Sequence, residues 1–439
     1  MRLRHLRSML IPQIAQPELL GRVQKVIGLL VEVGGLPNAR LGDLCDIEIH
    51  HREFVRAEVV GLEDERVILM PFDELSGIRN GAAVRWVSST PGVNVGPELL
   101  GRVVDAMGEP IDGGPPLNGT DSAQLHRDPP NPLARQRIRR QIETQIRALD
   151  GFVGIGEGQR IGIFAGSGVG KSVLLAMLAR NATSDVNVIA LIGERGREVR
   201  EFIEQNLGPE GLARSVVVVA TGNESALRRS RAALVATAIA EWFRDRGHSV
   251  LLTMDSVTRV AMAWREVGLT AGEPSTSKGY PPSVFSRLPR LLERSGAGES
   301  GTITGLYTVL VDGDDFAEPI SDATRSILDG HIVLTRDLAE SGHFPAIDLL
   351  RSASRVRRQV MPPQALETAD ALMKAEAAYR ENEDLIMIGQ YEEGSHPETD
   401  RMLRIREQFL AALRQAPEQR TPIGETRKLV EHLRGMMNG

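Results

Sequence analysis

The residues best able to do chemistry stand in one short glycine-rich segment. Between an apolar run at residues 160–164 and a helix-like run at residues 173–178, the chain reads Ala165-Gly166-Ser167-Gly168-Val169-Gly170-Lys171-Ser172. Glycines allow backbone N–H groups to turn inward onto phosphate oxygens, a lysine adds a point charge, and the N-terminus of the following helix favours an anion. A strand, this loop, Lys-Ser and a helix together predict a loop that holds a nucleoside triphosphate.

Different residues of this loop are expected to make different contacts with the nucleotide and its metal ion. Lys171 is expected at the β- and γ-phosphate oxygens, and Ser172 is expected to ligate Mg²⁺. One position departs from the usual GxxxxGK[ST] pattern, because Ala165 stands where the first glycine is usual. A glycine-rich turn without a ligand is the alternative interpretation. The residues of this segment expected to bind the nucleotide are Gly166, Ser167, Gly168, Val169, Gly170, Lys171, Ser172 and Val173.

Two carboxylates follow apolar runs and could complete such a site. Residues 250–254 lead directly to Asp255, and residues 188–192 lead to Gly193-Glu194-Arg195. An acid at the end of a strand downstream of a phosphate loop can hold Mg²⁺ through its water shell, and a carboxylate beside the γ-phosphate can orient the attacking water. Asp255 is therefore the candidate for the metal and Glu194 for the water. The alternatives are a strand-end turn for Asp255 and a surface ion pair for Glu194-Arg195.

The elements that must position these residues have the pattern of a parallel sheet. Continuous apolar runs alternate with helical patterns, as a sheet covered on both faces requires. The ligand site of such a sheet lies at the carboxyl ends of its strands, and the candidate residues follow the strands directly. The apolar runs are residues 160–164, 186–192, 216–220, 250–254, 303–311 and 332–334.

The flanking segments have different patterns. Short β-rich runs at residues 26–31, 45–49, 54–60 and 66–70 predict a small N-terminal barrel. Turn formers at residues 91–96 indicate a boundary, and residues 110–132 are expected to be irregular. Ile138, Ile142 and Ile146 predict a short helix within residues 137–150. From residue 364 onward helical spacing dominates, and Met402, Ile405, Phe409 and Leu413 form one packing stripe.

Composition excludes several classes of protein. The 439 residues carry a formal net charge of −6. This charge argues against binding of nucleic acid through the overall charge of the molecule. A single cysteine, Cys45, rules out an intrachain disulfide and fits a reducing cytoplasm. No apolar run is long enough to span a bilayer. The arginine- and leucine-rich residues 1–10 predict either a short surface-binding helix or a frayed terminus. The pair His50-His51 has no further ligands nearby in the sequence and is interpreted as polar residues at the surface, not as a metal site.

Five further motifs stand out in the chain. They are residues 193–202 (GERGREVREF), 254–259 (MDSVTR), 278–285 (KGYPPSVF), 326–331 (SILDGH) and 345–354 (PAIDLLRSAS). Together they closely resemble the ATPases of type III protein secretion, a family that includes the flagellar export ATPase and its injectisome counterpart, both relatives of the rotary ATP synthase β subunit. The resemblance runs from about Gly21 to the C-terminus. The chain departs from the family at Trp264, where glutamine is usual, and at Arg357-Arg358, where the family is more apolar.

The resemblance implies a role for each site residue. It gives Lys171 and Ser172 the phosphate and Mg²⁺ contacts, Glu194 the activation of water, and Asp255 the metal. Arg195 resembles the family's second residue at the γ-phosphate. Phe344 stands where relatives place an aromatic ring on adenine, with a core phenylalanine as the alternative, and Arg355 corresponds to the arginine finger that reaches a neighbouring subunit's nucleotide. Arg351, Arg357 and Arg358 are interpreted as interface or surface charges.

These observations predict an α/β P-loop NTPase of the RecA and ATP synthase type, with an N-terminal β-barrel and a C-terminal helical domain. The expected domains are an N-terminal segment at residues 1–20, the barrel at 21–90, the ATPase domain at 91–363 and the helical domain at 364–439. The resemblance implies ATP hydrolysis, with Mg²⁺, that energises export by a flagellar or injectisome apparatus, together with substrate unfolding and chaperone release. The cytoplasmic enzyme is expected at the inner face of the cell membrane.

Partners follow from the same resemblance. A regulatory stalk protein is expected at the N-terminal segment, and a central stalk protein, the export gate, secretion substrates and chaperones are expected as further partners. Because one chain holds both Glu194 and Arg355, identical copies could build a complete site at every interface, which predicts a homohexamer. The alternatives are a non-hydrolysing nucleotide-binding subunit of a rotary assembly and an RNA-tracking hexamer.

Overall fold

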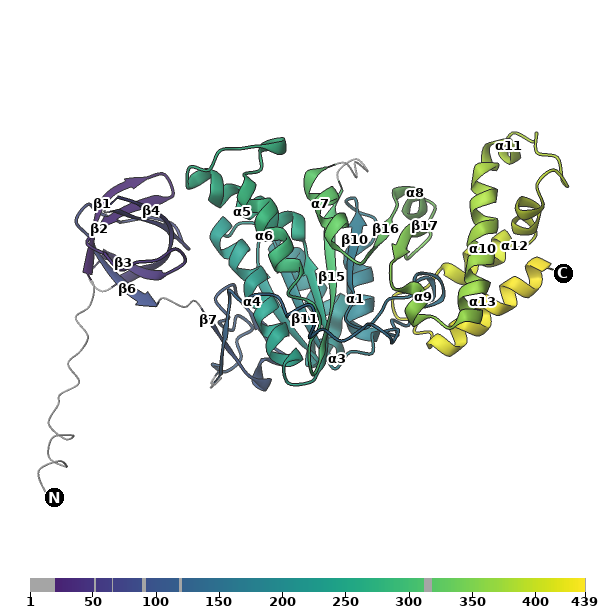
Figure 1. Ribbon diagram of the computed structural model, residues 1–439, viewed down its shortest axis with the longest axis horizontal. Coiled ribbons are helices and arrows are strands. Elements are labelled where there is room, and N and C mark those ends of the chain that lie inside the picture. Colours follow the sequence, from purple (N-terminus) through teal and green to yellow (C-terminus); the bar gives the residue numbers. More distant parts are fainter. Residues whose placement is uncertain are drawn as a thin grey trace, which may run out of the picture. The chain divides into compact units, whose positions relative to one another are not determined.

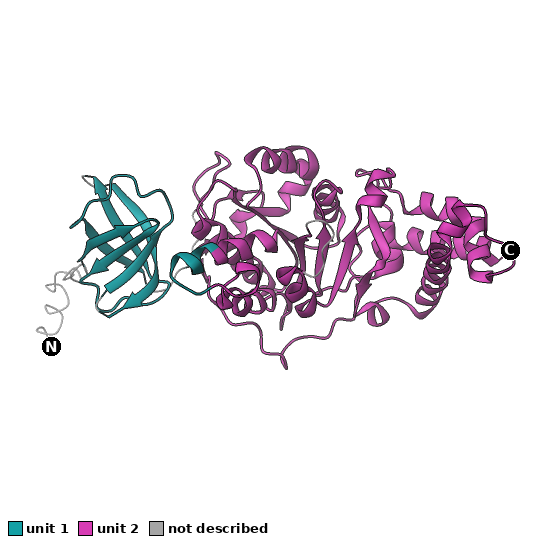
Figure 2. Ribbon diagram, turned by 90° about the horizontal axis from the view of Figure 1, so that it is seen from above, with its two compact units in different colours: residues 1–92, 266–274 teal, residues 93–265, 275–439 magenta. Residues whose placement is uncertain are grey.

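The computed structural model describes residues 20–50, 53–64, 66–88, 92–117, 121–311 and 318–438. The chain divides into two compact units, residues 1–92 with 266–274 and residues 93–265 with 275–439 (Figure 2). The N-terminal segment predicted at residues 1–10 and His51 lie outside the described residues. No helix among the described residues combines the length and apolar character that crossing a bilayer requires.

The N-terminal unit contains a closed six-stranded barrel, as predicted. Its order is β1-β2-β5-β4-β3-β6. Alternate residues of β4 are buried, and two of them, Ala57 and Val59, belong to the barrel core. Cys45 is buried in the same core. The strands are β1 (Leu20–Ile27), β2 (Leu30–Gly34), β3 (Leu44–His50), β4 (Glu53–Glu63), β5 (Arg66–Pro71) and β6 (Ala83–Ser88).

The prediction of one strand over residues 26–31 was wrong. The chain reverses there, so that Val26 pairs with Val31 and Ile27 with Leu30. Gly28 has φ of 56° at this turn, in the left-handed region that glycine adopts without steric cost. Because apolar residues stand on both sides of Gly28, the sequence has the pattern of one continuous strand although the chain forms a hairpin there.

The second unit is built on a sheet of nine strands, and its strand order is β17-β16-β10-β15-β13-β11-β12-β8 with β14 beside β15. The ladder from β16 to β8 is parallel, whereas β17 and β14 pair antiparallel. The predicted parallel sheet is therefore confirmed. The strands are β8 (Val103–Val104), β10 (Arg160–Ala165), β11 (Val186–Ile192), β12 (Ser215–Ala220), β13 (Ser249–Asp255), β14 (Gly296–Ala297), β15 (Thr302–Leu310), β16 (Gly330–Leu334) and β17 (Ile347–Ser354).

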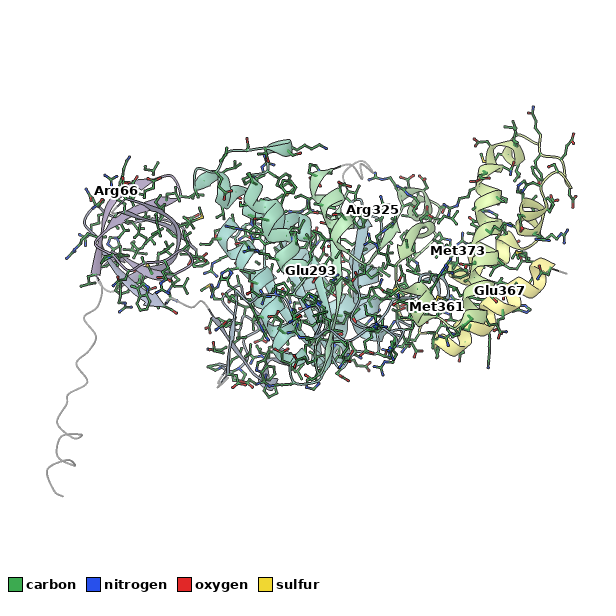
Figure 3. The ribbon with its side chains drawn as sticks, in the orientation of Figure 1. Arg66, Glu293, Arg325, Met361, Glu367 and Met373 are labelled. Atoms are coloured by element: carbon green, nitrogen blue, oxygen red, sulfur yellow. The ribbon has the colours of Figure 1, made fainter. Side chains whose placement is uncertain are left out.

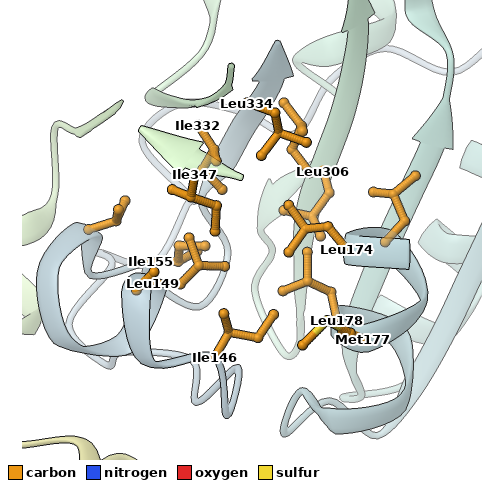
Figure 4. Packing of buried hydrophobic residues seen from close by; sticks show 14 of the residues in the cluster. Ile146, Leu149, Ile155, Leu174, Met177, Leu178, Leu306, Ile332, Leu334 and Ile347 are labelled. Carbon is orange, nitrogen blue, oxygen red and sulfur yellow. The ribbon is translucent and has the colours of Figure 1, made fainter. Parts of the chain in front are cut away.

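Helices cover both faces of this sheet (Figure 1). On β11, Val188 and Ala190 pack in the cluster that includes α4 (Ala226–Arg244), whereas Ile189 and Leu191 pack in the cluster that includes α1 (Lys171–Asn181). Figure 4 shows part of the second cluster, where side chains of α1 meet those of the sheet. The remaining helices of the sheet region are α2 (Gly196–Glu201), α3 (Gly208–Ala213), α5 (Val257–Thr270), α6 (Pro282–Leu292), α7 (Pro319–Ile327), α8 (Arg336–Glu340) and α9 (Arg357–Val360).

Trp264 on α5 is buried in the same cluster as α4. The residue that departs from the family pattern therefore packs inside its own chain. Burial of a large aromatic ring in the core explains how the chain accommodates it.

The C-terminal part is helical, as predicted. It consists of α10 (Pro363–Glu381), α11 (Glu383–Met387), α12 (Pro397–Leu413) and α13 (Ile423–Asn438). The predicted stripe on α12 is buried, and the ring of Phe409 packs edge-on against Phe152 at 5.8 Å between centroids. Phe152 belongs to the π-helix Leu149–Val153, which precedes the central strands. The helical part thus shares one hydrophobic core with the sheet.

The prediction of a helix over residues 137–150 was wrong. Residues 137–146 are extended or irregular, and the helical turn begins only at residue 147. The buried carboxylate of Asp150 accepts hydrogen bonds from the backbone N–H groups of Thr144 and Gln145 and from the Thr144 hydroxyl. These bonds and the bridge between Gln141 and Gly156 replace the bonds that a helix would make.

Shorter elements complete the fold. They are β7 (Gly92–Val95), which pairs with β9 (Asp121–Gln124), and two 3-10 helices, Pro97–Leu99 and Ser277–Gly279. A second π-helix, Phe202–Leu207, joins α2 to α3. Much of the predicted irregular stretch at residues 110–132 indeed lacks regular structure where it is described.

Candidate nucleotide site

The glycine-rich loop joins β10 to α1. β10 ends at Ala165 and α1 begins at Lys171, while Gly168 and Gly170 have φ values of 81° and 87°. These left-handed conformations turn the backbone within the loop and favour glycine. Ala165 is the last residue of the strand and is buried between its partners Leu310 and Leu334. Its methyl group packs in the core, so the departure from the usual motif leaves the loop itself unchanged.

Lys171, Glu194 and Asp255 meet at the carboxyl edge of the sheet. The Lys171 ammonium forms an ion pair with Asp255 Oδ1 and lies 3.6 Å from Glu194 Oε1. The three side chains are 12%, 16% and 3% exposed. They come together because β10, β11 and β13 are parallel strands of one sheet, so the residues that follow them converge at one edge.

The two carboxylates share one cation. Burial raises the pKa of Glu194, the Lys171 ammonium lowers it, and the Asp255 carboxylate raises it again, with a net upward shift. A carboxyl group in this setting holds a proton more readily than one in water. Ser172, the neighbouring hydroxyl, is exposed at the start of α1. One ammonium, two carboxylates and an exposed hydroxyl beside an open glycine loop form a donor set that suits a Mg²⁺–triphosphate.

The backbone around Glu194 is held by residues to which the sequence assigned no role. Arg259 on α5 donates to the carbonyl of Gly193 at 3.1 Å, and the N–H of Gly222 donates to the carbonyl of Glu194 at 2.9 Å. Gly193 has φ of 75°. Arg259 lies in the first turn of α5, the helix that follows the strand ending in Asp255, and this place after a strand of the sheet is the signal that could have pointed to it.

Arg336 is a second residue that the sequence did not single out. It begins α8, directly after the end of β16, and its guanidinium lies 3.7 Å from where a Cβ on Gly166 would stand. This position puts an additional cation beside the glycine loop. Its place after a strand of the same sheet is the signal that would have identified it.

Arg195 lies apart from the Lys171 cluster. Its side chain is 86% exposed and pairs with Glu198 at 3.2 Å, three residues further along α2. The structure therefore brings Glu194 to the candidate site while Arg195 makes the surface ion pair considered as the alternative. The role of Arg195 at a γ-phosphate stays a prediction.

Phe344 lies beside the glycine loop. Its ring is 3.4 Å from where a Cβ on Gly170 would stand, and its side chain is 45% exposed. A core phenylalanine was the alternative interpretation, and this exposure excludes it. The carbonyl of Phe344 also accepts the N–H of Gln415 at 2.9 Å, which ties the segment to the chain that follows α12.

Arg355 lies at the opposite edge of the sheet. β17 runs antiparallel to β16, so Ile347 pairs with Leu334 near the glycine loop, whereas Ser354 pairs with Gly330 at the amino ends of the parallel strands. Arg355 follows Ser354 and is exposed. The strand separates Arg355 from the glycine loop of its own chain.

Further cations lie on the sheet near Arg355. A cavity of about 460 Å³ is lined in part by Phe164, Arg325, His331 and Arg351, and Figure 3 labels Arg325 on α7. Burial lowers the pKa of His331, and the charges of Arg325 and Arg355 lower it further. Arg325 and Arg355 therefore both lie close enough to His331 to disfavour its protonation.

Comparison with known proteins agrees with this architecture. The model of the ATP synthase alpha/beta family nucleotide-binding domain matches residues 145–354, that of the family's beta-barrel domain matches residues 23–86, and that of the T3SS EscN ATPase C-terminal domain matches residues 361–432. These matches cover the barrel, the sheet and the C-terminal helices in turn.

Individual relatives are similar over nearly the whole chain. The flagellum-specific ATP synthase of Bacillus subtilis is 50% identical, with 94% of this chain and 95% of the relative covered. The type 3 secretion system ATPase of Xanthomonas euvesicatoria is 49% identical over 87% and 86%. The assembled ATPase EscN of the enteropathogenic E. coli type III secretion system superposes with a TM-score of 0.88 at 43% identity, over 94% of this chain and 100% of EscN. The chain belongs to the family of flagellum-specific ATP synthases and type 3 secretion system ATPases, within the ATP synthase alpha/beta family.

Proposed function

We propose that this protein hydrolyses ATP to energise protein export by a type III secretion apparatus, flagellar or injectisome. The observation that carries the proposal is the cluster of Lys171, Glu194 and Asp255 beside the open glycine loop. An α/β ATPase fold alone would support nucleotide binding, whereas a carboxylate facing the phosphate-binding lysine supports hydrolysis.

Each residue of the cluster has a distinct task. Lys171 exchanges its carboxylate partners for the β- and γ-phosphate oxygens, and the backbone of residues 166–170 and the start of α1 bind the remaining oxygens. Ser172 and Asp255 would hold Mg²⁺, which when bound neutralises charge on the phosphates. Glu194, released from Lys171, orients the attacking water and accepts its proton, a task to which a raised pKa is suited.

Arg195 and Phe344 are proposed to complete the contacts within one chain. Phe344 offers a half-exposed ring next to Gly170, where it can stack on adenine. Arg195 has an exposed side chain that pairs with Glu198 on the surface, and such pairs cost little to break. Turning Arg195 toward the γ-phosphate would therefore give up one weak ion pair.

Arg355 is proposed to act on the nucleotide of a neighbouring copy, and the protein is therefore proposed to assemble as a homohexamer. The position of Arg355 at the far edge of the sheet supports action in trans, since its own glycine loop lies at the other end of the strands. A solved relative is described as assembled EscN in complex with its central stalk EscO. By analogy, we propose a central stalk partner for this chain.

The remaining partners and the location are proposed from the family. They are a regulatory stalk protein at the N-terminal segment, the export gate, secretion substrates and chaperones, at the cytoplasmic face of the cell membrane. Unfolding of substrates and release of chaperones would be the work that hydrolysis drives.

The test separates hydrolysis from binding. The purified protein should hydrolyse ATP when Mg²⁺ is present, and Glu194→Gln should keep ATP binding while losing most turnover, because it removes a charge without altering the phosphate loop. Equal turnover in the two proteins would refute the role of Glu194. A wild-type protein that binds ATP without hydrolysis would favour the non-hydrolysing subunit. In a secreting strain that lacks its own export ATPase gene, the wild type but not Glu194→Gln should restore export.

A further inference from the structure

Asp255 has a second buried partner that has no role in the mechanism above. Thr308 lies on β15, the neighbour of β13, and is buried. Its hydroxyl donates to Asp255 Oδ1 at 2.7 Å, and the carbonyl of Met254 lies at 3.2 Å. Because a hydroxyl has one proton and the carboxylate is both closer and charged, the bond to Asp255 is the stronger of the two.

Both partners of Asp255 bind the same oxygen. Lys171 also contacts Oδ1, and within the described ranges no donor reaches Oδ2. The carboxylate is therefore fixed with Oδ1 toward the sheet and the lysine, while Oδ2 keeps its capacity to accept a hydrogen bond. An oxygen in that condition can accept from a water molecule that surrounds Mg²⁺.

The two partners differ once a nucleotide is bound. A triphosphate carries more negative charge than one carboxylate, so its oxygens compete for the Lys171 ammonium. Thr308 is uncharged and lies within a strand, so the phosphates do not draw its hydroxyl away from Asp255. Its hydroxyl then becomes the partner that keeps Asp255 Oδ1 in place, and it does so without adding a positive charge next to the metal.

We infer that Thr308 is a positioning residue, whose hydroxyl orients Asp255 for Mg²⁺ in the nucleotide-bound state. The inference rests on the proposed function of this site as a Mg²⁺–nucleotide site. It assigns to a buried threonine in an apolar strand a task that spacing in the sequence does not reveal.

The chain offers a matched control. Thr308→Val removes the donor at nearly constant volume, and Thr308→Ser restores it. Thr253 is a second buried threonine, on β13 itself, and its hydroxyl has no hydrogen-bond partner among the described residues. Thr253→Val therefore makes the same chemical change two residues from Asp255 without breaking a bond. If valine at residue 308 lowers the yield of folded protein, Thr308→Ala lacks the same donor and replaces it.

The readouts are thermal stabilisation by ADP, with Mg²⁺ and with EDTA, and the Mg²⁺ concentration for half-maximal ATP hydrolysis. Thr308→Val should need about 10-fold more Mg²⁺ in both Mg²⁺-dependent measurements, the order expected for a lost hydrogen bond to a charged group. Its stabilisation by ADP in EDTA should match the wild type, because the glycine loop is intact. Thr308→Ser and Thr253→Val should both behave as the wild type.

Three results would overturn the inference. They are an unchanged Mg²⁺ requirement in Thr308→Val, an equal shift in Thr253→Val, and a loss of ADP stabilisation in EDTA that accompanies the loss in Mg²⁺. Failure of the proposed function is a separate outcome. A wild type that binds ADP with Mg²⁺ but does not hydrolyse ATP would refute that function, while the stabilisation measurements would still decide the role of Thr308.

Discussion

Replacing Arg355 by alanine should abolish most ATP hydrolysis while nucleotide binding persists. In the sheet, Ser354 pairs with Gly330, and Leu334 lies four residues further along β16, beside Ala165. Arg355 follows Ser354 and lies level with Asp329, so five steps of about 3.3 Å put Arg355 about 17 Å from the start of its own glycine loop along the strand direction. That separation exceeds what an arginine side chain spans, so a catalytic Arg355 must act on another copy.

The expected loss is large. An arginine that stabilises charge in the transition state of phosphoryl transfer contributes on the order of 10³-fold or more to turnover. Arg355→Ala should lose activity by that order, whereas its stabilisation by ADP should change little. Arg358→Ala is the matched control, because Arg358 is an exposed arginine three residues away, and its effect should be much smaller.

Mixing two inactive proteins distinguishes action in trans from action in cis. Arg355→Ala keeps an intact glycine loop, and Lys171→Ala keeps an intact finger. In rings mixed at equal amounts, roughly a quarter of the interfaces pair an intact loop with an intact finger from the next copy, so up to about a quarter of wild-type turnover should return if sites act independently.

A titration of wild type with Lys171→Ala supplies the control, because a linear decline of turnover establishes that sites act independently. Mixed rings, verified by mass, that recover no turnover after a linear control would refute the trans role of Arg355. Recovery at the expected level would establish that each working site takes residues from two chains.

Other regions yield independent predictions. Lys171→Ala should lose stabilisation by ADP, because the loop loses its only lysine, and an unchanged melting temperature shift would contradict this. Specific activity should rise with protein concentration as rings assemble; a constant value from a monomeric sample upward would argue against a shared site. Phe409→Ala should lower the free energy of unfolding by about 3–5 kcal/mol, measured by denaturant titration, since it leaves a cavity against Phe152. Burial raises the pKa of Asp150 from 3.8 to about 7, so the folded state binds more protons than the unfolded state between these values. Stability should therefore fall as pH rises from about 4 to about 7, by up to about 1.4 kcal/mol per pH unit, and Asp150→Asn should remove that slope; an identical slope in the variant would contradict the assignment.

Local sequence determined the phosphate loop and the strands around it. Continuous apolar runs can be buried only in a sheet covered on both faces, and residues that follow parallel strands must meet at one edge. For that reason the meeting of Lys171, Glu194 and Asp255 was predictable from three separate segments. The barrel and the stripe on α12 were predictable for the same reason, since their apolar periods of two and of about 3.6 residues match strand and helix.

Other features depend on tertiary contacts and cannot be predicted from the spacing of apolar residues along the chain. The spacing of Ile138, Ile142 and Ile146 suited a helix, but the hydrogen bonds that Asp150 accepts from Thr144 and Gln145 hold an extended segment. A bond between residues on neighbouring strands, such as Thr308 to Asp255, depends on strand order and register, which no single strand encodes.

The same limit applies to direction and distance. Glu194 and Arg195 are adjacent in sequence, yet one faces Lys171 and the other pairs with Glu198 on the surface. The start of β17 lies near the glycine loop, and Arg355 stands only ten residues after Pro345 in the sequence. Because β17 runs antiparallel to β16, Arg355 nevertheless lies at the other end of the sheet. Neighbouring side chains point in different directions, and the two ends of an extended strand lie far apart. The three-dimensional arrangement alone therefore decides which residues a chain can supply to its own nucleotide and which it can supply only to the nucleotide of a neighbour.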